Sequence, residues 1–318
     1  MKILVTGGAG FIGSHIVDAY VGLGHDVVVV DNLSSGQRKN VNENAVFHEV
    51  DIEDEQEVER VIKTHRPDVL NHHAAQKSVL QSVKNPVHDA KVNVVGILNV
   101  IRLSLAYGVR KFIYASSGGA LAGDADIAPT PESYHPKLLS PYAITKYMGE
   151  RYLHVLAGES GMSYTILRYA NVYGPRQDRD SEGGVISIFI NNLLAGKVSK
   201  IYTYPGMPDG MFRDYVYVED ICRANVAALK PDATGTFNIG SGREVSTAEL
   251  YTLVQRVCNR YSDPVFAEPR PGDVRRSLLD LSLSKSVLGW QPTVALAEGI
   301  EQTCQFYNSL SAEGRGSL

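Results

Sequence analysis

The chain has 318 residues, 44% of them hydrophobic, which is enough for the core of one large domain or two. Its net charge of −4 is spread over both halves without a basic stripe, which argues against nucleic acid as a main partner. No apolar run reaches the roughly 18 residues of a membrane span, and MKILVTGG leads straight into a strand without a charged leader. We therefore expect a soluble, cytoplasmic protein.

Short β-branched segments alternate with helical periodicity through the first half of the chain. We expect strands at residues 2–8, 26–31, 45–51, 68–75, 111–117 and 163–171. Helices are expected at residues 12–23, 54–65, about 86–107 and 142–159. Nearly continuous apolar strands separated by helices predict an α/β fold with a doubly wound parallel sheet of Rossmann type.

After about residue 172 the pattern loosens. Glycines, prolines and charges break it into short elements, as in GPRQDRDSEGG, YPGMPDG and EPRPGD. We predict a first domain at residues 1–172 and a smaller C-terminal α/β lobe at residues 173–318, with some exchange of chain between them.

The three cysteines, Cys222, Cys258 and Cys304, are too few and too scattered for a disulfide framework or a metal knuckle. We expect them to be buried thiols in a reducing compartment, and we expect no metal site.

The segment TGGAGFIGSH follows the first predicted strand and opens a helix, with Gly7, Gly10 and Gly13 spaced by three. Glycine allows a tight turn and lets backbone N–H groups approach a pyrophosphate at the helix N-terminus, where the helix dipole favours anions. Asp31 ends the second predicted strand, where a carboxylate would bind a ribose diol and repel a 2′-phosphate. These residues predict a dinucleotide site that prefers NAD to NADP. Asp51 and Ile52, at the end of the third strand, are expected to reach the adenine.

The segment SPYAITK carries Tyr142 and Lys146, four residues apart on a predicted helix, so both side chains project from one face. A tyrosine with its ordinary pKa of about 10 is a poor base at neutral pH, but a nearby ammonium and a cationic nicotinamide favour the phenolate. The preceding strand ends in Ser116 and Ser117. Together with the dinucleotide fold, this predicts hydride exchange between an alcohol and a ketone.

These motifs resemble the extended short-chain dehydrogenase/reductase family, and within it the nucleotide-sugar 4-epimerases of the UDP-glucose 4-epimerase type. The resemblance also rests on VVDNLSSG, HHAAQKSV, ASSGG, LRYANVYGPRQ, RDYVYVED, FNIGSG and RPGD, and it runs from residue 1 to about 305. It implies that residues 1–172 bind NAD and carry the catalytic Tyr142 and Lys146, while residues 173–318 bind a UDP-sugar. The implied reaction is epimerisation at C4 of a UDP-hexose through a transient 4-keto sugar. The family also implies a homodimer formed by a four-helix bundle.

The resemblance assigns roles residue by residue. The implied catalytic residues are Tyr142, Lys146, Ser117 and Ser116. The implied NAD contacts are Gly7, Gly10, Phe11, Ile12, Gly13, Asp31, Asn32, Ser35, Gly36, Asp51, Ile52, Ala74, Ala75, Lys77, Asn93, Tyr142, Lys146 and Tyr169. The implied substrate contacts are Ser117, Tyr142, Asn171, Val185, Tyr202, Arg213, Arg270 and Asp273.

The stretch SSGGALAGD departs from the commoner family pattern, S-S-[ST]-x-x-V-Y-G. The third hydroxyl position is Gly118 here, and the tyrosine position is Ala122. We expect Ser117 to replace the missing hydroxyl and the sugar pocket to be wider at Ala122. Ser277, small where some relatives are bulky, leaves room for an N-acetyl group.

Other functions share this scaffold. Decarboxylases and 4,6-dehydratases also oxidise C4, but the acidic pair of the dehydratases is replaced here by Ser117 and Gly118. A uronate substrate stays open because Arg275 and Arg276 lie close to RPGD. A non-catalytic NAD-sensing regulator is the alternative of another class, and it would typically lack the tyrosine or lysine that this chain keeps.

Overall fold

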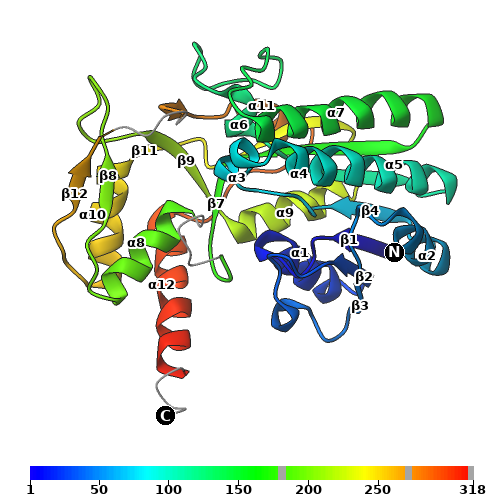
Figure 1. Cartoon of the computed structure of the whole chain (residues 1–318), viewed down its shortest axis with the longest axis horizontal. Coiled ribbons are helices and arrows are strands. Elements are labelled where there is room, and N and C mark those ends of the chain that lie inside the picture. Colours follow the sequence, from blue (N-terminus) through cyan, green and yellow to red (C-terminus); the bar gives the residue numbers. More distant parts are fainter. Residues whose placement is uncertain (178–183, 269–273, 314–318) are drawn as a thin grey trace.

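The computed structural model describes residues 1–177, 184–268 and 274–313, with side chains up to residue 310. A seven-stranded parallel sheet runs through its larger part, in the order β3-β2-β1-β4-β5-β6-β10 (Figure 1). These strands are β1 (Lys2–Thr6), β2 (Asp26–Asp31), β3 (Val46–Glu49), β4 (Val69–His72), β5 (Lys111–Ser117), β6 (Ser163–Tyr169) and β10 (Gly235–Ile239). The chain order reverses between β1 and β4, which is the switch point where doubly wound sheets bind ligands.

Helices cover both faces of this sheet. On one face, α1 (Phe11–Gly22) and α9 (Val218–Ala228) pack in one apolar cluster with β1 and β2. On the other face lie α2 (Glu55–His65), α5 (Ile97–Ala106) and α7 (Pro141–Ser160). Side chains of β1 alternate between the two clusters: Ile3 and Val5 point to the first, and Leu4 points to the second. This explains the nearly continuous apolar strands of the sequence, because both faces are buried.

The six predicted strands and the four predicted helical segments are all present. The segment expected as one helix at about 86–107 is α4 (Pro86–Ala90), a π-helical turn η2 (Lys91–Gly96) and α5 in direct succession. Short elements beside these are η1 (Arg38–Asn40), α3 (Val79–Lys84) and α6 (Gly118–Ala122). The doubly wound α/β prediction is therefore confirmed.

Two elements beyond residue 172 return to the large sheet. β10 pairs with β6 as its seventh strand, and α9 packs against α1. Sequence periodicity did not identify them as parts of this sheet, because each lies among the broken pattern of the second half. The division at residue 172 remains a prediction. α9 and β10 come after residue 172 in sequence but belong to the large sheet and its helices.

The smaller lobe lies to one side of the large sheet (Figure 1). Its strands are β7 (Asn171–Tyr173), β8 (Lys200–Tyr202), β9 (Phe212–Tyr217), β11 (Glu244–Ser246), β12 (Val265–Ala267) and β13 (Arg276–Ser277). Its helices are α8 (Val185–Leu194), α10 (Thr247–Cys258) and α12 (Leu296–Glu313), whereas α11 (Ser282–Ser286) lies against β10 of the large sheet, where Ser284 Oγ donates to the Asn238 carbonyl at 2.8 Å. β9 pairs with β7, β11 and β13, and a third apolar cluster fills the space between β9, α8, α10 and α12.

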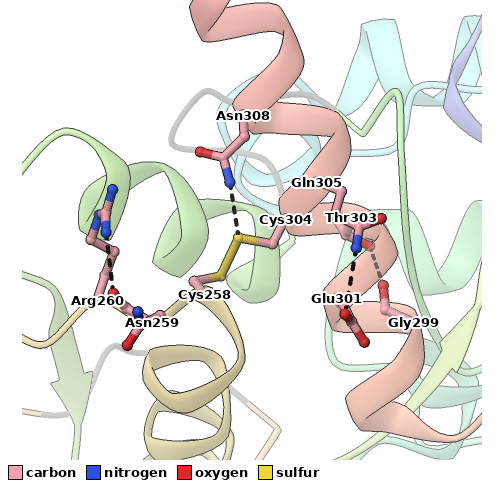
Figure 2. Close-up of a disulfide and its surroundings, with 9 residues drawn as sticks. All are labelled: Cys258, Asn259, Arg260, Gly299, Glu301, Thr303, Cys304, Gln305 and Asn308. Atoms are coloured by element: carbon pink, nitrogen blue, oxygen red, sulfur yellow. Dashed lines mark hydrogen bonds between the residues drawn. A yellow bond between two sulfur atoms is a disulfide. The ribbon is translucent and has the colours of Figure 1, made fainter.

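The expectation of three separate thiols is wrong for two of them. Cys258, at the end of α10, and Cys304, within α12, form a disulfide with a Cα–Cα distance of 6.1 Å (Figure 2). They lie 46 positions apart in sequence, and the packing of α10 against α12 brings them together. Spacing along the chain carries no information on that packing. Cys222 is a buried free thiol, as expected.

Within the described ranges, no helix is both long enough and apolar enough to span a bilayer.

Candidate active site

The glycine turn lies between β1 and α1 and touches the loop that follows β4. Gly7 has a φ of +71°, and a Cβ there would be 2.6 Å from the backbone nitrogen of Ala74. A Cβ at Gly13 would overlap the carbonyl oxygen of Gly7. Gly10 immediately precedes α1, so Phe11 and Ile12 begin that helix. The turn therefore leaves backbone N–H groups uncovered at a helix N-terminus, which suits a pyrophosphate.

The predicted adenosine end gathers at the carboxyl ends of β2 and β3. Asp31 is buried, and its carboxylate accepts hydrogen bonds from the backbone N–H groups of Ala9 (2.9 Å) and Leu33 (2.8 Å). Each carboxylate oxygen keeps a further lone pair for a ribose diol. Asn32 donates to Asp51 at 2.8 Å, which joins the ends of the two strands.

The other residues predicted at this end lie on the same two loops. Gly36 lies against Asp31, because a Cβ there would be 2.8 Å from Oδ1 of that side chain. Ser35 is exposed beside it, and Ile52 is buried against Gly96. The cradle and the Asp31 carboxylate fit NAD.

The loop after β4 lies beside the glycine turn. The Ala74 N–H donates to Thr6 Oγ1 of β1 at 3.3 Å, Ala75 is half-buried, and Lys77 is exposed. Asn93, on the π-helical turn η2, makes two hydrogen bonds with the backbone of Gln76, the residue between Ala75 and Lys77. Its Oδ1 accepts from the Gln76 N–H (2.9 Å), and its Nδ2 donates to the Gln76 carbonyl (2.9 Å).

Helix α7 presents the predicted catalytic pair to the end of β5. Ser140 caps the helix by accepting from the Ala143 N–H at 3.2 Å, and Pro141 occupies its first turn. Lys146 is buried and donates from Nζ to the carbonyl of Ala115 at 2.9 Å. Burial lowers the pKa of Lys146 to about 8, so it keeps its proton at neutral pH. Burial raises the pKa of Tyr142 to about 12, and a side-chain hydrogen bond with Ser117 opposes that shift.

The two serines at the end of β5 have different partners. The Ser117 side chain lies beside Tyr142 and lowers its pKa. Ser116 donates to Glu150 Oε1 at 2.6 Å, deep in the protein. Glu150 also accepts from both Nε (2.9 Å) and Nη2 (2.6 Å) of Arg168, on β6. Ser116 is thus tied into a buried ion pair on the inner side of α7, whereas Ser117 lies with the tyrosine.

Gly118 and Ala122 lie on α6, directly after these serines. A Cβ at Gly118 would overlap Leu279, so Leu279 occupies the space of the side chain that the commoner family pattern carries here. Ala122 lines a cavity of about 10 Å³ with Gly118 and Leu279, which is at the lower end of the ~10–15 Å³ that one ordered water requires. Ser277 is buried on β13, 3.1 Å from where a Cβ of Gly119 would be.

The residues predicted to hold the substrate come from the edge of the sheet and the smaller lobe. Asn171 on β7 donates to the carbonyl of Asp214 at 3.1 Å, next to Arg213 on β9. Arg213 donates to the carbonyls of Phe212 (2.9 Å) and Val274. Val185 begins α8, and Tyr202 ends β8. Arg270 and Asp273 lie outside the described residues.

Tyr169, at the end of β6, belongs to a buried polar chain that sequence reasoning did not identify. Asn225 Nδ2 donates to the Tyr169 hydroxyl at 2.8 Å, and that hydroxyl lies 3.1 Å from Nε2 of His73. Burial lowers the pKa of His73 to about 3, so it is neutral. The His-His pair before Ala74 is the one sequence signal that marks this position.

Asp89 and Glu150 were also missed, although spacing holds a signal for each. Glu150 continues the i, i+4 series of Tyr142 and Lys146 on α7. Asp89 precedes Asn93 by four residues, and its side chain accepts from Asn93 Nδ2 at 3.1 Å.

Residues 3–240 match the model of the NAD dependent epimerase/dehydratase family. The chain is similar to the UDP-glucose 4-epimerase of Thermotoga maritima solved with UDP-glucose (47% identity, TM-score 0.94, 98% of this chain and 100% of that one). It is also similar to the UDP-glucose 4-epimerase of Thermus thermophilus in complex with NAD (41%, 0.91, 100% of both chains). A third similar structure is the UDP-N-acetylglucosamine 4-epimerase of Methanobrevibacter ruminantium in complex with UDP-N-acetylmuramic acid (33%, 0.91, 97% and 98%). This chain is an enzyme of the NAD-dependent epimerase/dehydratase family.

Proposed function

We propose that this enzyme inverts the configuration at C4 of a UDP-hexose, interconverting UDP-glucose and UDP-galactose. The observation that carries the proposal is the group formed by half-buried Tyr142 and Ser117 with buried Lys146 at the end of β5. It lies in a chain that is similar over nearly its whole length to proteins named UDP-glucose 4-epimerase.

The residues of the glycine turn and the ends of β2, β3 and β4 would hold NAD. Gly7, Gly10 and Gly13 leave room for the pyrophosphate, and Asp31 offers a carboxylate to the adenosine ribose. When bound, NAD would take a hydride from C4 of the sugar and return it, so that a 4-keto sugar exists in between.

Tyr142 is the proposed proton carrier at the C4 hydroxyl. Its buried hydroxyl is a weak acid, so a phenolate there needs a hydrogen-bond donor and a nearby cation. Ser117 is the donor, and the Lys146 ammonium, one helical turn along α7, is the cation. We infer that Ser117 takes the role of the hydroxyl missing at Gly118, because Ser116 is engaged by Glu150.

The nucleotide diphosphate is proposed to bind at the edge of the smaller lobe. Guanidinium groups form paired hydrogen bonds with phosphates, which suits Arg213 and Arg270. Asn171, Asp273, Val185 and Tyr202 are proposed as further contacts of the UDP-sugar.

Acceptance of the N-acetylated sugars is the broader form of this proposal. Ser277 and Ala122 are small, and one similar protein is named for UDP-N-acetylglucosamine. The space beside Ala122 is only about 10 Å³, so we base the proposed acceptance of N-acetylated sugars on Ser277. Steric discrimination by packing alone is worth about 1–3 kcal/mol, so we expect tolerance rather than a switch of substrate.

The experiment is incubation of the purified enzyme with UDP-glucose, UDP-galactose, UDP-N-acetylglucosamine and UDP-glucuronate, with anomeric NMR of the products. We expect conversion of the first two to a common mixture. Tyr142→Phe should lower turnover on the order of 10²-fold or more. A loss of carbon dioxide or water from the sugar would favour a decarboxylase or a dehydratase. No conversion of any sugar by protein that binds NAD would favour the sensor.

We also propose that the enzyme is a cytoplasmic homodimer whose four-helix bundle is formed by the helices at about 88–107 (α4, η2 and α5) and 142–159 (α7), with α3 at its edge. Large apolar side chains are exposed on these elements, among them Val83 (63%), Val87 (65%) and Ile144 (47%).

A further inference from the structure

Asp89 is a fully buried carboxylate that the reaction described above does not use. It lies on the short helix α4, with none of its surface exposed. Burying a carboxylate is costly unless hydrogen bonds satisfy it. Asp89 accepts three of them: from Gln76 Nε2 (2.6 Å), Asn93 Nδ2 (3.1 Å) and Thr145 Oγ1 (2.7 Å).

The three partners belong to three different elements of the site. Gln76 follows Ala75 in the loop after β4, and Asn93 lies on η2. Thr145 lies on α7, between Tyr142 and Lys146. The π-helical form of η2 is itself uncommon and occurs frequently at functional sites. A single carboxylate therefore connects the loop proposed to contact the cofactor with the helix that carries the catalytic pair.

We propose that Asp89 is a positioning residue for the epimerase reaction: its carboxylate fixes α7 relative to the loop after β4, so that Tyr142 and Lys146 face the bound cofactor in one arrangement. This inference rests on the proposed function for its chemistry, and on the three hydrogen bonds for its geometry. Proton transfer depends on placement to well under 1 Å, which a connection of this kind provides.

The charge of Asp89 acts on Lys146 as well. Burial lowers the pKa of Lys146 to about 8, and the carboxylates of Asp89 and Glu150 oppose that shift. The ionisable groups facing Lys146 are Asp89 from α4, Glu150 from α7, Tyr114 from β5, His72 at the end of β4 and His73 directly after it, and Tyr142 lies one helical turn away on α7. Both histidines have lowered pKa values through burial and carry no charge at neutral pH. The two carboxylates therefore keep Lys146 protonated.

Asp89→Asn separates the charge from the hydrogen bonds. The amide oxygen can still accept from Gln76 and Asn93, and the amide nitrogen can donate to Thr145 Oγ1. The Thr145 hydroxyl can then turn to the Tyr142 carbonyl, which lies 3.1 Å away. We expect the alkaline limb of the kcat/KM pH profile, set by Lys146, to move down by about one pH unit or more. NAD affinity, measured by calorimetry, should stay within about two-fold of wild type.

Thr145→Val makes the opposite separation, because it removes the link to α7 and keeps the charge. We expect kcat to fall by about 10-fold to 100-fold, with the alkaline limb and the NAD affinity unchanged. Thr145→Ser, which retains the hydroxyl, should restore most of kcat. Asp89→Ala breaks all three bonds and should also weaken NAD binding by about ten-fold or more.

The NAD affinities test the proposal even if the proposed sugar reaction is wrong. A wild-type enzyme that converts no UDP-hexose would contradict the proposed function, and the NAD affinities of Asp89→Ala and Asp89→Asn would still test the connection. If Asp89→Ala fails to fold, the two conservative variants carry the test. An unshifted alkaline limb in Asp89→Asn, together with wild-type kcat in Thr145→Val or wild-type NAD affinity in Asp89→Ala, would overturn the proposal.

Discussion

At the scale of single residues, the two serines at the end of β5 have separable roles. Ser117 lowers the pKa of Tyr142, so Ser117→Ala removes a group that favours the phenolate and should lower kcat by about 10-fold to 100-fold. Ser116 is bonded to the buried Glu150, so Ser116→Ala should cost about 1.5–3 kcal/mol of unfolding free energy, with a much smaller loss of kcat. Steady-state kinetics and urea unfolding of both variants measure this. Equal effects of the two changes on kcat would contradict the assignment.

His73 gives a second prediction at this scale. The Asn225 amide is oriented by its bond to the Ile221 carbonyl (2.9 Å), so its nitrogen donates to Tyr169. The Tyr169 hydroxyl is then left to donate to His73 Nε2, which puts the ring proton on Nδ1. Burial lowers the pKa of His73 to about 3, so ¹⁵N NMR should give an unprotonated Nε2 and a protonated Nδ1 from pH 8 to about 5. His73→Phe assigns the signals. A protonated Nε2 would contradict the prediction, because His73 would then be the donor to the Tyr169 hydroxyl.

The same pKa has a consequence for stability. The folded His73 binds its proton near pH 3, whereas an unfolded histidine binds one near its ordinary 6.5. The unfolded state therefore gains a proton first as the pH falls. The contribution of His73 to stability is complete above pH 6.5 and is lost between there and pH 3, by up to about 1.4 kcal/mol per pH unit.

At the scale of secondary structure, the ion pair between Glu150 and Arg168 joins α7 to β6. Both side chains are largely buried, with exposures of 4% and 11%. Arg168→Ala leaves the carboxylate buried without its partner, which should cost about 3–5 kcal/mol of unfolding free energy. The matched control is Arg110, whose pair with Asp68 is 73% exposed on the arginine side and should be worth under about 1 kcal/mol. Urea unfolding of both alanine variants compares them, and equal losses would be inconsistent with a supporting role for the buried pair.

The elements also explain what the sequence could and could not predict. The glycine turn, Asp31, and the Tyr142–Lys146 pair were found because each is a local pattern at the end of a strand or on one helix face. The bonds of Asp89 to Thr145 and of Glu150 to Arg168 join residues 56 and 18 positions apart. The disulfide and the return of β10 to the sheet likewise depend on how distant helices and strands pack. Local periodicity contains no information on such contacts.

At the scale of the whole molecule, α7 has two faces with different tasks. Tyr142, Lys146 and Glu150 point inward, and Ile144, Met148 and Val155 on the same helix are exposed. Leu80 and Val83 of α3 and Val87 of α4 are exposed as well, on elements that the chain packs beside α7. Apolar side chains gathered on neighbouring helices are typical of a surface that a partner covers.

We therefore predict a homodimer, because a second copy of this surface would bury the exposed side chains and support α7 from behind Tyr142 and Lys146, the proposed catalytic residues. Val83→Glu and Ile144→Glu should dissociate it by placing charges in an apolar interface, and they should lower kcat because α7 loses its support. Phe266→Glu is the matched control: Phe266 is 58% exposed but lies on β12, in the smaller lobe. Light scattering at micromolar concentration measures the mass of each protein. A monomeric wild type, or a dimer that Phe266→Glu disrupts and Val83→Glu does not, would move the interface away from α7.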